Sequence, residues 1–355
     1  MNAPRHPDPS QWSCPVPIQS ADTVQMAHGG GGRLTQNLID TVFVPALRNQ
    51  ALEVLHDGAL LDLPPGRLAF STDSYVIDPV FFPGGDIGSL AVHGTVNDLA
   101  MCGARPLYLS AGFILEEGFP LADLRRIAMS MGQAAAAAGV CVVTGDTKVV
   151  DRGKADRIFI NTAGIGIVPV GIDIAPTRAS PGDLVLINGE IAVHGIAIMS
   201  VREGLQFETE MVSDSASLHE LVAGAIDVTG PQLHVLRDPT RGGVASALNE
   251  IAMAAGVSIE LEERCIPINE AVRGACELLG FDPLYVANEG KCLAIVAPSH
   301  AGAVLEAWRR HPLGRDAAVI GRVLEGPRGS LVLKTRIGAR RIVYMLSGEQ
   351  LPRIC

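Results

Sequence analysis

Four aspartates stand where apolar segments of the sequence end, each beside small or hydroxylated residues. One such aspartate usually caps a helix or forms a turn. Four in similar settings instead indicate a shared set of Mg²⁺ ligands, because Mg²⁺ prefers carboxylate oxygens and commonly bridges them to substrate phosphates. The four are Asp73 in FSTDSY, Asp98 in TVNDLA, Asp146 in VTGDTK and Asp238 in LRDPTRGG.

Two further side chains have the chemistry to move protons. Lys148, two residues past Asp146, can supply a compact cation or, when desolvated, a proton acceptor. Glu289 in VANEGK lies between apolar segments and is followed by glycine. From the residues alone, a turn carboxylate and a general acid or base are equally good interpretations of Glu289.

A run of four glycines, Gly29–Gly32, follows His28 and precedes a segment with helical periodicity. Glycine allows backbone N–H groups to approach an anion closely, and a helix N-terminus adds partial positive charge. The run lacks the GK[ST] of a P-loop, and it is not a dinucleotide fingerprint following a strand. A phosphate-binding loop and a merely flexible loop both remain open.

The last residue is Cys355, in EQLPRIC. A thiol at a chain end is prone to oxidation and cross-linking, and prenylation does not explain it because that modification needs the cysteine four residues from the end. The segment after Tyr344 can extend over roughly 36–40 Å, and Pro352 disfavours a helix at Leu351. We therefore expect an extended tail that can carry the thiol between sites.

Composition limits the class of protein. The 355 residues are 48% hydrophobic and 19% charged, which predicts a globular chain of two domains. The formal net charge of −10 repels nucleic-acid phosphates. Seven cysteines without a CxxC pair indicate neither a disulfide framework nor a structural zinc site. No signal peptide or membrane span is evident, so the sequence predicts a cytoplasmic protein.

Periodicity and turn residues predict mixed α/β structure in two halves, separated by the Pro- and Gly-rich stretch 169–183. The predicted organisation is a loose leader (1–23), a first domain (24–170), a second domain (180–345) and a mobile tail (346–355). Strands are expected at 67–78, 106–115, 141–151, 157–168 and 291–298, and helices after the glycine run and at 87–104, 121–140 and 301–311. A strand and a helix are expected within 184–205, a loop, a helix and a strand within 236–261, and further strands at the end. The predicted fold class is therefore two α/β sandwiches.

Several long motifs together resemble one known family. They are HGGGGR, FSTDSYVIDPVFFPGGDIG, GTVNDLAMCGA, GFILEEGFP, VTGDTKVVDRG, LRDPTRGG, VANEGK and the terminal LPRIC. They are similar to the HypE family of hydrogenase maturation factors, the carbamoyl dehydratases. That family lies in the ATP-using superfamily of aminoimidazole ribonucleotide synthetase and selenophosphate synthetase. The resemblance runs from about Met26 to Cys355.

The resemblance implies a reaction and its partners. A carbamoyltransferase, HypF, would place a carbamoyl group on the thiol of Cys355. The protein would use ATP and Mg²⁺ to dehydrate this S-carboxamide to an S-cyanate. The cyano group would then pass to iron on a HypC–HypD scaffold complex, as a cyanide ligand of [NiFe] hydrogenase. The family fold implies a homodimer closed by a β-barrel of N-terminal strands, with ATP at the domain interface.

The resemblance also implies roles for single residues. Lys148 and Glu289 occupy the family's positions for a proton relay, and Asp73, Asp98, Asp146 and Asp238 those of the metal ligands. His194 lies in GEIAVHG, where the family has a glycine-rich turn, and we interpret it as structural. The expected nucleotide-binding residues are His28, Gly29, Gly30, Asp73, Asn97, Asp98, Asp146 and Thr147.

Two alternatives stay open at this point. One is a sister enzyme that phosphorylates a small free substrate, whose activity would survive loss of Cys355. The HGGGGR loop contains no cysteine, which argues against selenophosphate synthesis. The other is a non-catalytic carrier whose tail binds a partner, and the four candidate Mg²⁺ ligands argue against it.

Overall fold

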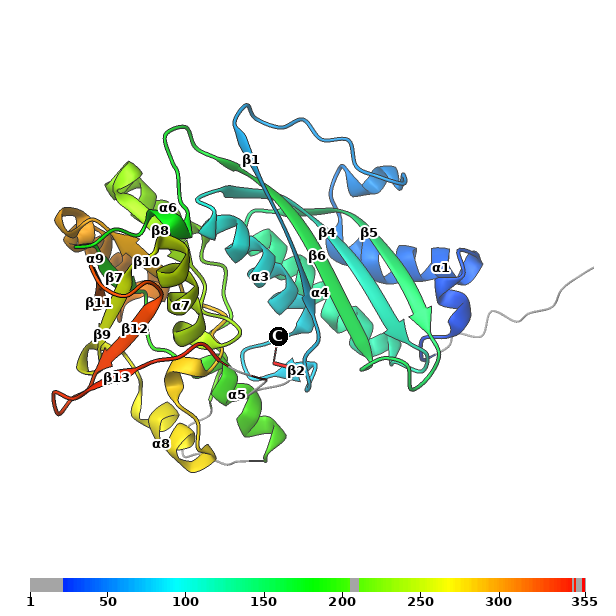
Figure 1. Cartoon of the computed structure of the whole chain (residues 1–355). Coiled ribbons are helices and arrows are strands. Elements are labelled where there is room, and N and C mark those ends of the chain that lie inside the picture. Colours follow the sequence, from blue (N-terminus) through cyan, green and yellow to red (C-terminus); the bar gives the residue numbers. More distant parts are fainter. Residues whose placement is uncertain (1–21, 205–210, 347, 349–352, 355) are drawn as a thin grey trace, which may run out of the picture.

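Two sheets organise the chain, one in each half (Figure 1). The computed structural model describes residues 22–204, 211–346, 348 and 353–354. The first half holds a four-stranded sheet in the order β1-β6-β4-β5, and the second a seven-stranded sheet in the order β13-β12-β9-β11-β7-β10-β8. Helices pack on both sheets, so the predicted pair of α/β sandwiches is confirmed.

The first half follows the predicted pattern closely. Its strands pair antiparallel except β4 and β5, which run parallel, and the short β2 and β3 form a separate hairpin. Its elements are η2 (Met26–Gly29), α1 (Arg33–Leu38), the π-helical η3 (Ile39–Phe43), α2 (Val44–Leu47), η4 (Leu52–Val54), β1 (Arg67–Tyr75), β2 (Phe81–Phe82), β3 (Gly85–Asp86), α3 (Ile87–Met101), β4 (Arg105–Glu116), α4 (Leu121–Ala137), β5 (Cys141–Val150) and β6 (Ile158–Val168).

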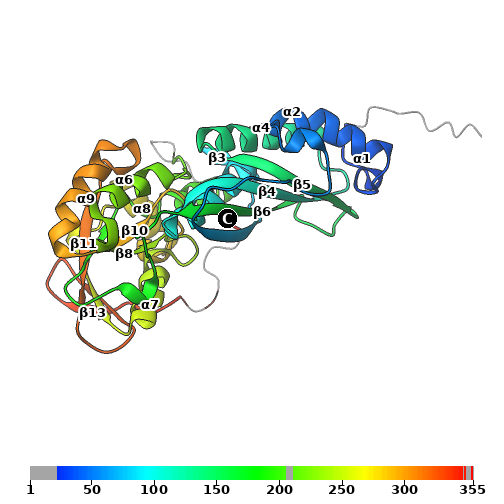
Figure 2. The ribbon, with the colours of Figure 1, turned by 90° about the horizontal axis from the view of Figure 1, so that it is seen from above.

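One face of the four-stranded sheet is covered by helices and the other is open. Along β6 every second residue is buried, as expected for a strand with one face on a core. Figure 2 shows α1, α2 and α4 on one side of the sheet, and no described helix covers the other side. The open face carries large apolar side chains: Phe70 is 66% exposed, Leu68 51% and Ile114 42%.

Helix α3 lies between the two halves. Its first turn is capped by Asp86, whose carboxylate accepts the N–H groups of Gly88 at 2.8 Å and Ser89 at 3.1 Å. Twelve of its 15 residues are buried, because it packs on β1 and β6 and also on α6 of the second half. A helix buried on all sides needs no polar face.

The second half is a three-layered sandwich. Leu293 and Ile295 of β10 point into the core beneath α7 and α8, whereas Ala294 and Val296 point into the core beneath α6 and α9. Its elements are η5 (Pro176–Arg178), β7 (Leu184–Ile187), α5 (Val193–Arg202), α6 (His219–Thr229), η6 (Gly230–Gln232), β8 (Leu233–Arg237), α7 (Gly243–Ala255), β9 (Ser258–Glu262), η7 (Glu263–Cys265), α8 (Glu270–Leu279), η8 (Pro283–Tyr285), β10 (Leu293–Val296), α9 (Pro298–Arg310), η9 (Pro312–Gly314), β11 (Ala318–Leu324), β12 (Ser330–Lys334) and β13 (Arg340–Ile342).

The predicted strands and helices are confirmed, with ends that differ by a few residues. The structure adds α6 and α8, which the predicted set lacked, and the N-terminal helix contains a π-helical segment. Most of the predicted leader lies outside the described residues, but Asp22 and Val24 already bind the chain at Gly118–Leu121 through backbone hydrogen bonds. Among the described residues, no helix has the length and apolar character to cross a membrane.

Two helical glycines provide a test of the packing. A Cβ on Gly132 of α4 would lie 1.9 Å from the carbonyl oxygen of Ala46, whereas a Cβ on Gly302 of α9 would meet nothing within 4 Å. Gly132→Ala should lower the free energy of unfolding by about 1–3 kcal/mol, because α2 and α4 must separate. Gly302→Ala should raise it by up to about 1 kcal/mol through helix propensity. Urea unfolding measures both, and equal effects would contradict the close packing of α2 on α4.

Candidate active site

Three of the four predicted aspartates meet where the two halves face each other. Asp73 lies on β1, Asp98 on α3 and Asp238 just after β8. Burial and the neighbouring Asp73 raise the pKa of Asp98, although the Ser71 hydroxyl donates to its Oδ2 at 2.6 Å. Burial and the Asp98 charge raise the pKa of Asp238 to about 7. These carboxylates therefore share a region of incompletely neutralised negative charge.

Glu289 belongs to the same cluster. Its side chain is buried, and burial together with the charges of Asp238, Asp214 and Asp73 raises its pKa well above the ordinary value. Its Oε1 has no hydrogen-bond partner among the described residues. A buried carboxyl group with a raised pKa and an oxygen that has no hydrogen-bond partner is suited to proton transfer to or from a bound substrate.

Basic groups near this cluster are few. The Nη2 atom of Arg241 lies 3.8 Å from Asp73 Oδ1, and the Arg241 side chain is largely exposed. Lys291 forms a buried ion pair with Asp214, with 3.0 Å between Nζ and Oδ2. Burial acts to raise the pKa of Asp214, but the Lys291 ammonium and the N–H of Glu289 prevail and lower it. Lys291 thus neutralises Asp214 and leaves the other carboxylates without an equivalent partner.

Lys148 and Asp146 lie elsewhere. Their side chains are exposed on β5 and form an ion pair, with 3.1 Å between Lys148 Nζ and Asp146 Oδ2. Because β1 and β5 are the two edges of the four-stranded sheet, about 14 Å separates the strands. Within one chain the structure does not bring Lys148 to Glu289, nor Asp146 to the other three aspartates.

The fit to a divalent cation depends on this arrangement. Among the described residues, no three His, Cys, Asp or Glu side chains form a group that could hold a metal ion unaided. Mg²⁺ commonly takes only one or two carboxylates together with water and substrate phosphates. The unneutralised charge of Asp73, Asp98 and Asp238 fits such a cation, and the Mg²⁺ site stays a prediction.

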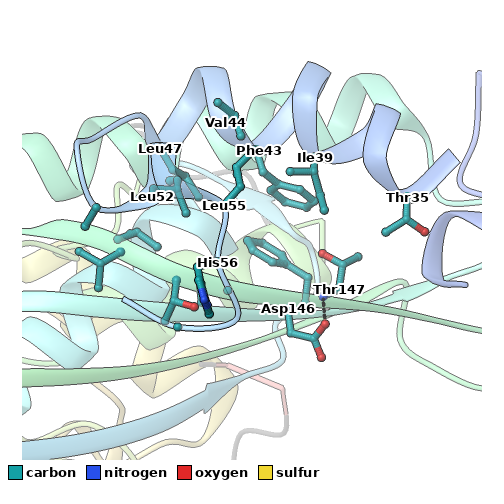
Figure 3. Close-up of a pocket in the computed structure, with 18 of the residues that line it drawn as sticks. Thr35, Ile39, Phe43, Val44, Leu47, Leu52, Leu55, His56, Asp146 and Thr147 are labelled. Carbon is teal, nitrogen blue, oxygen red and sulfur yellow. Dashed lines mark hydrogen bonds between the residues drawn. The ribbon is translucent and has the colours of Figure 1, made fainter. Parts of the chain in front are cut away.

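A cavity of about 220 Å³ lies between the N-terminal helix and the β5 edge (Figure 3). Apolar side chains form most of its wall, and Thr147 turns towards it while the Asp146 carboxylate points away from the helices. The labelled lining residues are Thr35, Ile39, Phe43, Val44, Leu47, Leu52, Leu55, His56, Asp146 and Thr147.

The glycine run packs beside β5, at the edge of the four-stranded sheet. A Cβ on Gly29 would lie 2.6 Å from the backbone nitrogen of Val149, so Gly29 permits close packing. The N–H of Gly31 donates to Thr35 Oγ1 at 2.9 Å, and His28 Nδ1 accepts the N–H of Gln25. Nucleotide binding by His28, Gly29 and Gly30 stays a prediction.

The side-chain amide of Asn97 is already used in hydrogen bonds within the protein. It is buried on α3, its Oδ1 accepts the N–H of Leu218 at 2.7 Å, and its Nδ2 donates to the carbonyl oxygen of Ala216 at 3.0 Å. These bonds fix the loop 213–218 against the first half. Nucleotide binding by Asn97 also stays a prediction.

Sequence analysis missed four residues that shape the cluster. Arg241 lies within the LRDPTRGG motif, so the motif itself carried a signal for it. Asp214 and Lys291 pair across 77 positions of sequence, and nothing local connects them. Tyr75 is buried at the end of β1, and burial and Asp73 raise its pKa well above the ordinary value.

The terminal thiol of Cys355 lies outside the described residues, but the two residues before it are described. Ile354 forms an antiparallel bridge with Ile77, and the Asp78 N–H donates to the carbonyl oxygen of Arg353 at 3.3 Å. The tail therefore reaches the segment that directly follows β1, the strand that carries Asp73.

Comparison with known proteins defines the class. Residues 55–168 match the family described as AIR synthase related protein, N-terminal domain, and residues 180–334 match the corresponding C-terminal domain. The chain thus has both domains of the AIR synthase related proteins. A carbamoyl dehydratase HypE from Azotobacter vinelandii is 57% identical over 333 residues, covering 94% of this chain and 97% of that protein. The chain belongs to the HypE family of carbamoyl dehydratases, and the resemblance drawn from the motifs is confirmed.

Two solved structures are similar over most of the chain. A hydrogenase maturation protein HypE in complex with ATP is 50% identical with a TM-score of 0.90, covering 94% of this chain and 100% of that one. A HypE–HypF complex is 47% identical with a TM-score of 0.77, covering 89% of this chain and 100% of that one.

The raised pKa of Asp238 predicts a specific pH dependence. The native state holds this proton more tightly than the unfolded state, so its contribution to stability is lost as pH rises from the ordinary aspartate pKa through about 7. Asp238→Asn removes that loss. In urea unfolding without ATP or Mg²⁺, the free energy of unfolding of the variant, relative to that of the wild type, should increase from pH 5 to pH 8. Asp227→Asn, at an exposed carboxylate of α6, controls for the lost charge. If the free energies of unfolding of Asp238→Asn and wild type differ by a constant amount over this range, the raised pKa of Asp238 is contradicted.

Proposed function

We propose that this chain is an ATP-dependent carbamoyl dehydratase whose substrate is an S-carboxamide on its own Cys355. The observation that carries the proposal is that the tail docks directly after β1, the strand that carries Asp73 of the carboxylate cluster. Ile354 binds beside Ile77, four residues along the chain from Asp73, a span of about 13 Å in extended backbone. A thiol one residue beyond Ile354 is within reach of the cluster that contains Glu289.

The chemistry needs the groups that are present. An amide oxygen is a poor leaving group, so the carboxamide oxygen first accepts the γ-phosphoryl group of ATP. The C–O bond then breaks, phosphate departs with that oxygen, and the nitrogen gives up its two protons as the C≡N bond forms. Glu289 and Lys148 are the proposed proton acceptors. Asp73, Asp98, Asp146 and Asp238 would hold Mg²⁺, which supplies charge neutralisation on the transferring phosphoryl group.

A homodimer would bring together the carboxylate cluster and Lys148, the two parts of this site that one chain keeps apart. The apolar open face formed by Leu68, Phe70 and Ile114 favours burial against a second copy. If two four-stranded sheets close into one barrel, the β1 edge of each meets the β5 edge of the other. Lys148 of the partner subunit would then lie near Asp73 and Glu289, which one chain alone keeps apart.

The reaction needs a donor and an acceptor besides ATP. We propose a HypF carbamoyltransferase as donor, supported by the similarity to the HypE–HypF complex. We propose a HypC–HypD iron scaffold as acceptor of the cyano group. The thiol must visit both partners and the cluster, and residues 346–355 provide the tether.

Mass spectrometry of the tail peptide tests the reaction. Wild-type protein supplied with its carbamoyl donor and Mg-ATP should gain a carbamoyl group on Cys355 and then lose one water. Cys355→Ala should show neither change. Lys148→Ala and Glu289→Gln should carry the carbamoyl group but lose water about 10²–10⁴-fold more slowly, because one proton acceptor is missing. Lys154→Ala, in the β5–β6 turn, is the matched control and should behave as wild type. ATP consumption with a small free molecule by Cys355→Ala would instead support a sister enzyme.

Mixing two inactive variants tests whether the site is shared between subunits. A dimer of one Lys148→Ala chain and one Glu289→Gln chain has one site with both residues intact. After unfolding and refolding together, an equal mixture should recover about a quarter of wild-type dehydration, since half of the dimers are mixed and each has one working site. Either variant refolded alone is the control. No recovery from verified mixed dimers would show that both residues act within one chain.

A further inference from the structure

The end of the tail binds at a site formed by residues from both halves of the chain. Ile354 is 3% exposed and packs in the core of the first half, where its bridge partner Ile77 also lies. The carbonyl oxygen of Arg353 accepts bonds from the Asp78 N–H and from the Arg202 guanidinium. The Arg353 side chain pairs with Asp156 at 3.2 Å. A chain end held by backbone bonds, a buried side chain and an ion pair has a defined register.

His194, at the start of α5, binds the last peptide carbonyl of this tail. Its Nε2 lies 2.7 Å from the carbonyl oxygen of Ile354, and its Nδ1 lies 2.7 Å from Ser213 Oγ. Because a carbonyl oxygen only accepts, Nε2 must carry the proton. Burial lowers the pKa of His194, so the ring is neutral and Nδ1 accepts the Ser213 hydroxyl. The edge-on contact with Phe82, at 5.7 Å between centroids, holds the ring plane.

Through Nδ1, His194 is connected to the loop that binds the backbone of Glu289. Ser213 Oγ also accepts the N–H of Ser215 at 3.1 Å, so this short loop is fixed to the imidazole. Asp214, between these two serines, accepts the N–H of Glu289 at 3.2 Å. His194 therefore bonds directly to the tail on one side and to the loop that holds the Glu289 backbone on the other.

We propose that His194 is a positioning residue that sets the register of the terminal thiol relative to Glu289. It fixes the carbonyl of Ile354, one residue before Cys355, to the framework that holds the carboxylate. The use of that thiol rests on the proposed function, whereas the docking of the tail does not. Release of the tail removes the protein acceptor of the Nε2 proton, and this lost hydrogen bond favours the docked state.

Hydrogen exchange at the Asp78 amide reports docking directly, because its acceptor is Arg353 of the tail. In full-length protein without ATP, this amide should exchange more slowly than in a chain truncated after Gly348. His194→Asn should raise the exchange rate roughly tenfold, towards that of the truncated chain. His194→Gln can place a donor near the position of Nε2 and should restore slow exchange. His234→Asn removes a partly buried histidine that pairs with Asp183 in the second half, and it should leave the Asp78 amide unchanged.

The outcomes separate the inference from the proposed function. Asp78 exchange in His194→Asn equal to wild type would overturn the role of His194, and equal rates in wild type and the truncated chain would overturn docking. If docking holds, carbamoylated His194→Asn should also lose water from its tail about tenfold more slowly at saturating ATP, while its carbamoylation is not slowed. Slow exchange in a wild type that shows no dehydration would defeat the proposed function and leave the docking intact.

Discussion

Buried negative charge between the two halves is the constraint on which the rest of the site depends. Asp73, Asp98, Asp238 and Glu289 come from four separate segments and converge with less positive charge than they need. Lys291 is committed to Asp214, and Arg241 approaches Asp73 only from an exposed position. Such an arrangement is costly for an empty protein, as the raised pKa values of three of these groups show. It is understandable if the site is completed by a cation and a phosphorylated ligand.

The open face of the four-stranded sheet fits the proposed role of Lys148. The basic group expected to act with Glu289 is Lys148, which lies on the edge strand remote from the cluster. An apolar sheet face open to solvent on one side is an unstable surface for a lone chain, because it exposes large side chains such as Phe70. Closing that face against a second copy would bury the apolar surface and bring a cation to the carboxylates in one step. Stability and chemistry therefore favour the same assembly.

The sequence predicted what periodicity and motifs encode locally. The strands and main helices follow from alternation and from helical spacing, and the aspartates follow from their positions at segment ends. Helix α8 was missed although it had clear end signals, with Asn269 before its first residue and Gly280 after its last. The pairings of Asp214 with Lys291 and of His194 with Ile354 join residues 77 and 160 positions apart, and no local pattern specifies them. Likewise, the sequence placed Asp146 in one set with the other three aspartates because their settings are similar. The strand order of the sheet, which sequence does not reveal, places Asp146 away from them.

The proposed reaction requires the tail to bind and to leave, and the opposing free-energy contributions to its docking are similar in size. Burial of Ile354 contributes about 2–3 kcal/mol, and the three hydrogen bonds to its last two carbonyls contribute about 1 kcal/mol each. The half-exposed pair of Arg353 with Asp156 adds between 0 and about 1 kcal/mol. Ordering two residues with a long side chain opposes this by about 4–6 kcal/mol. Because these amounts nearly cancel, a single contact such as that of His194, or a new contact made by a modified thiol, is enough to shift the docked population.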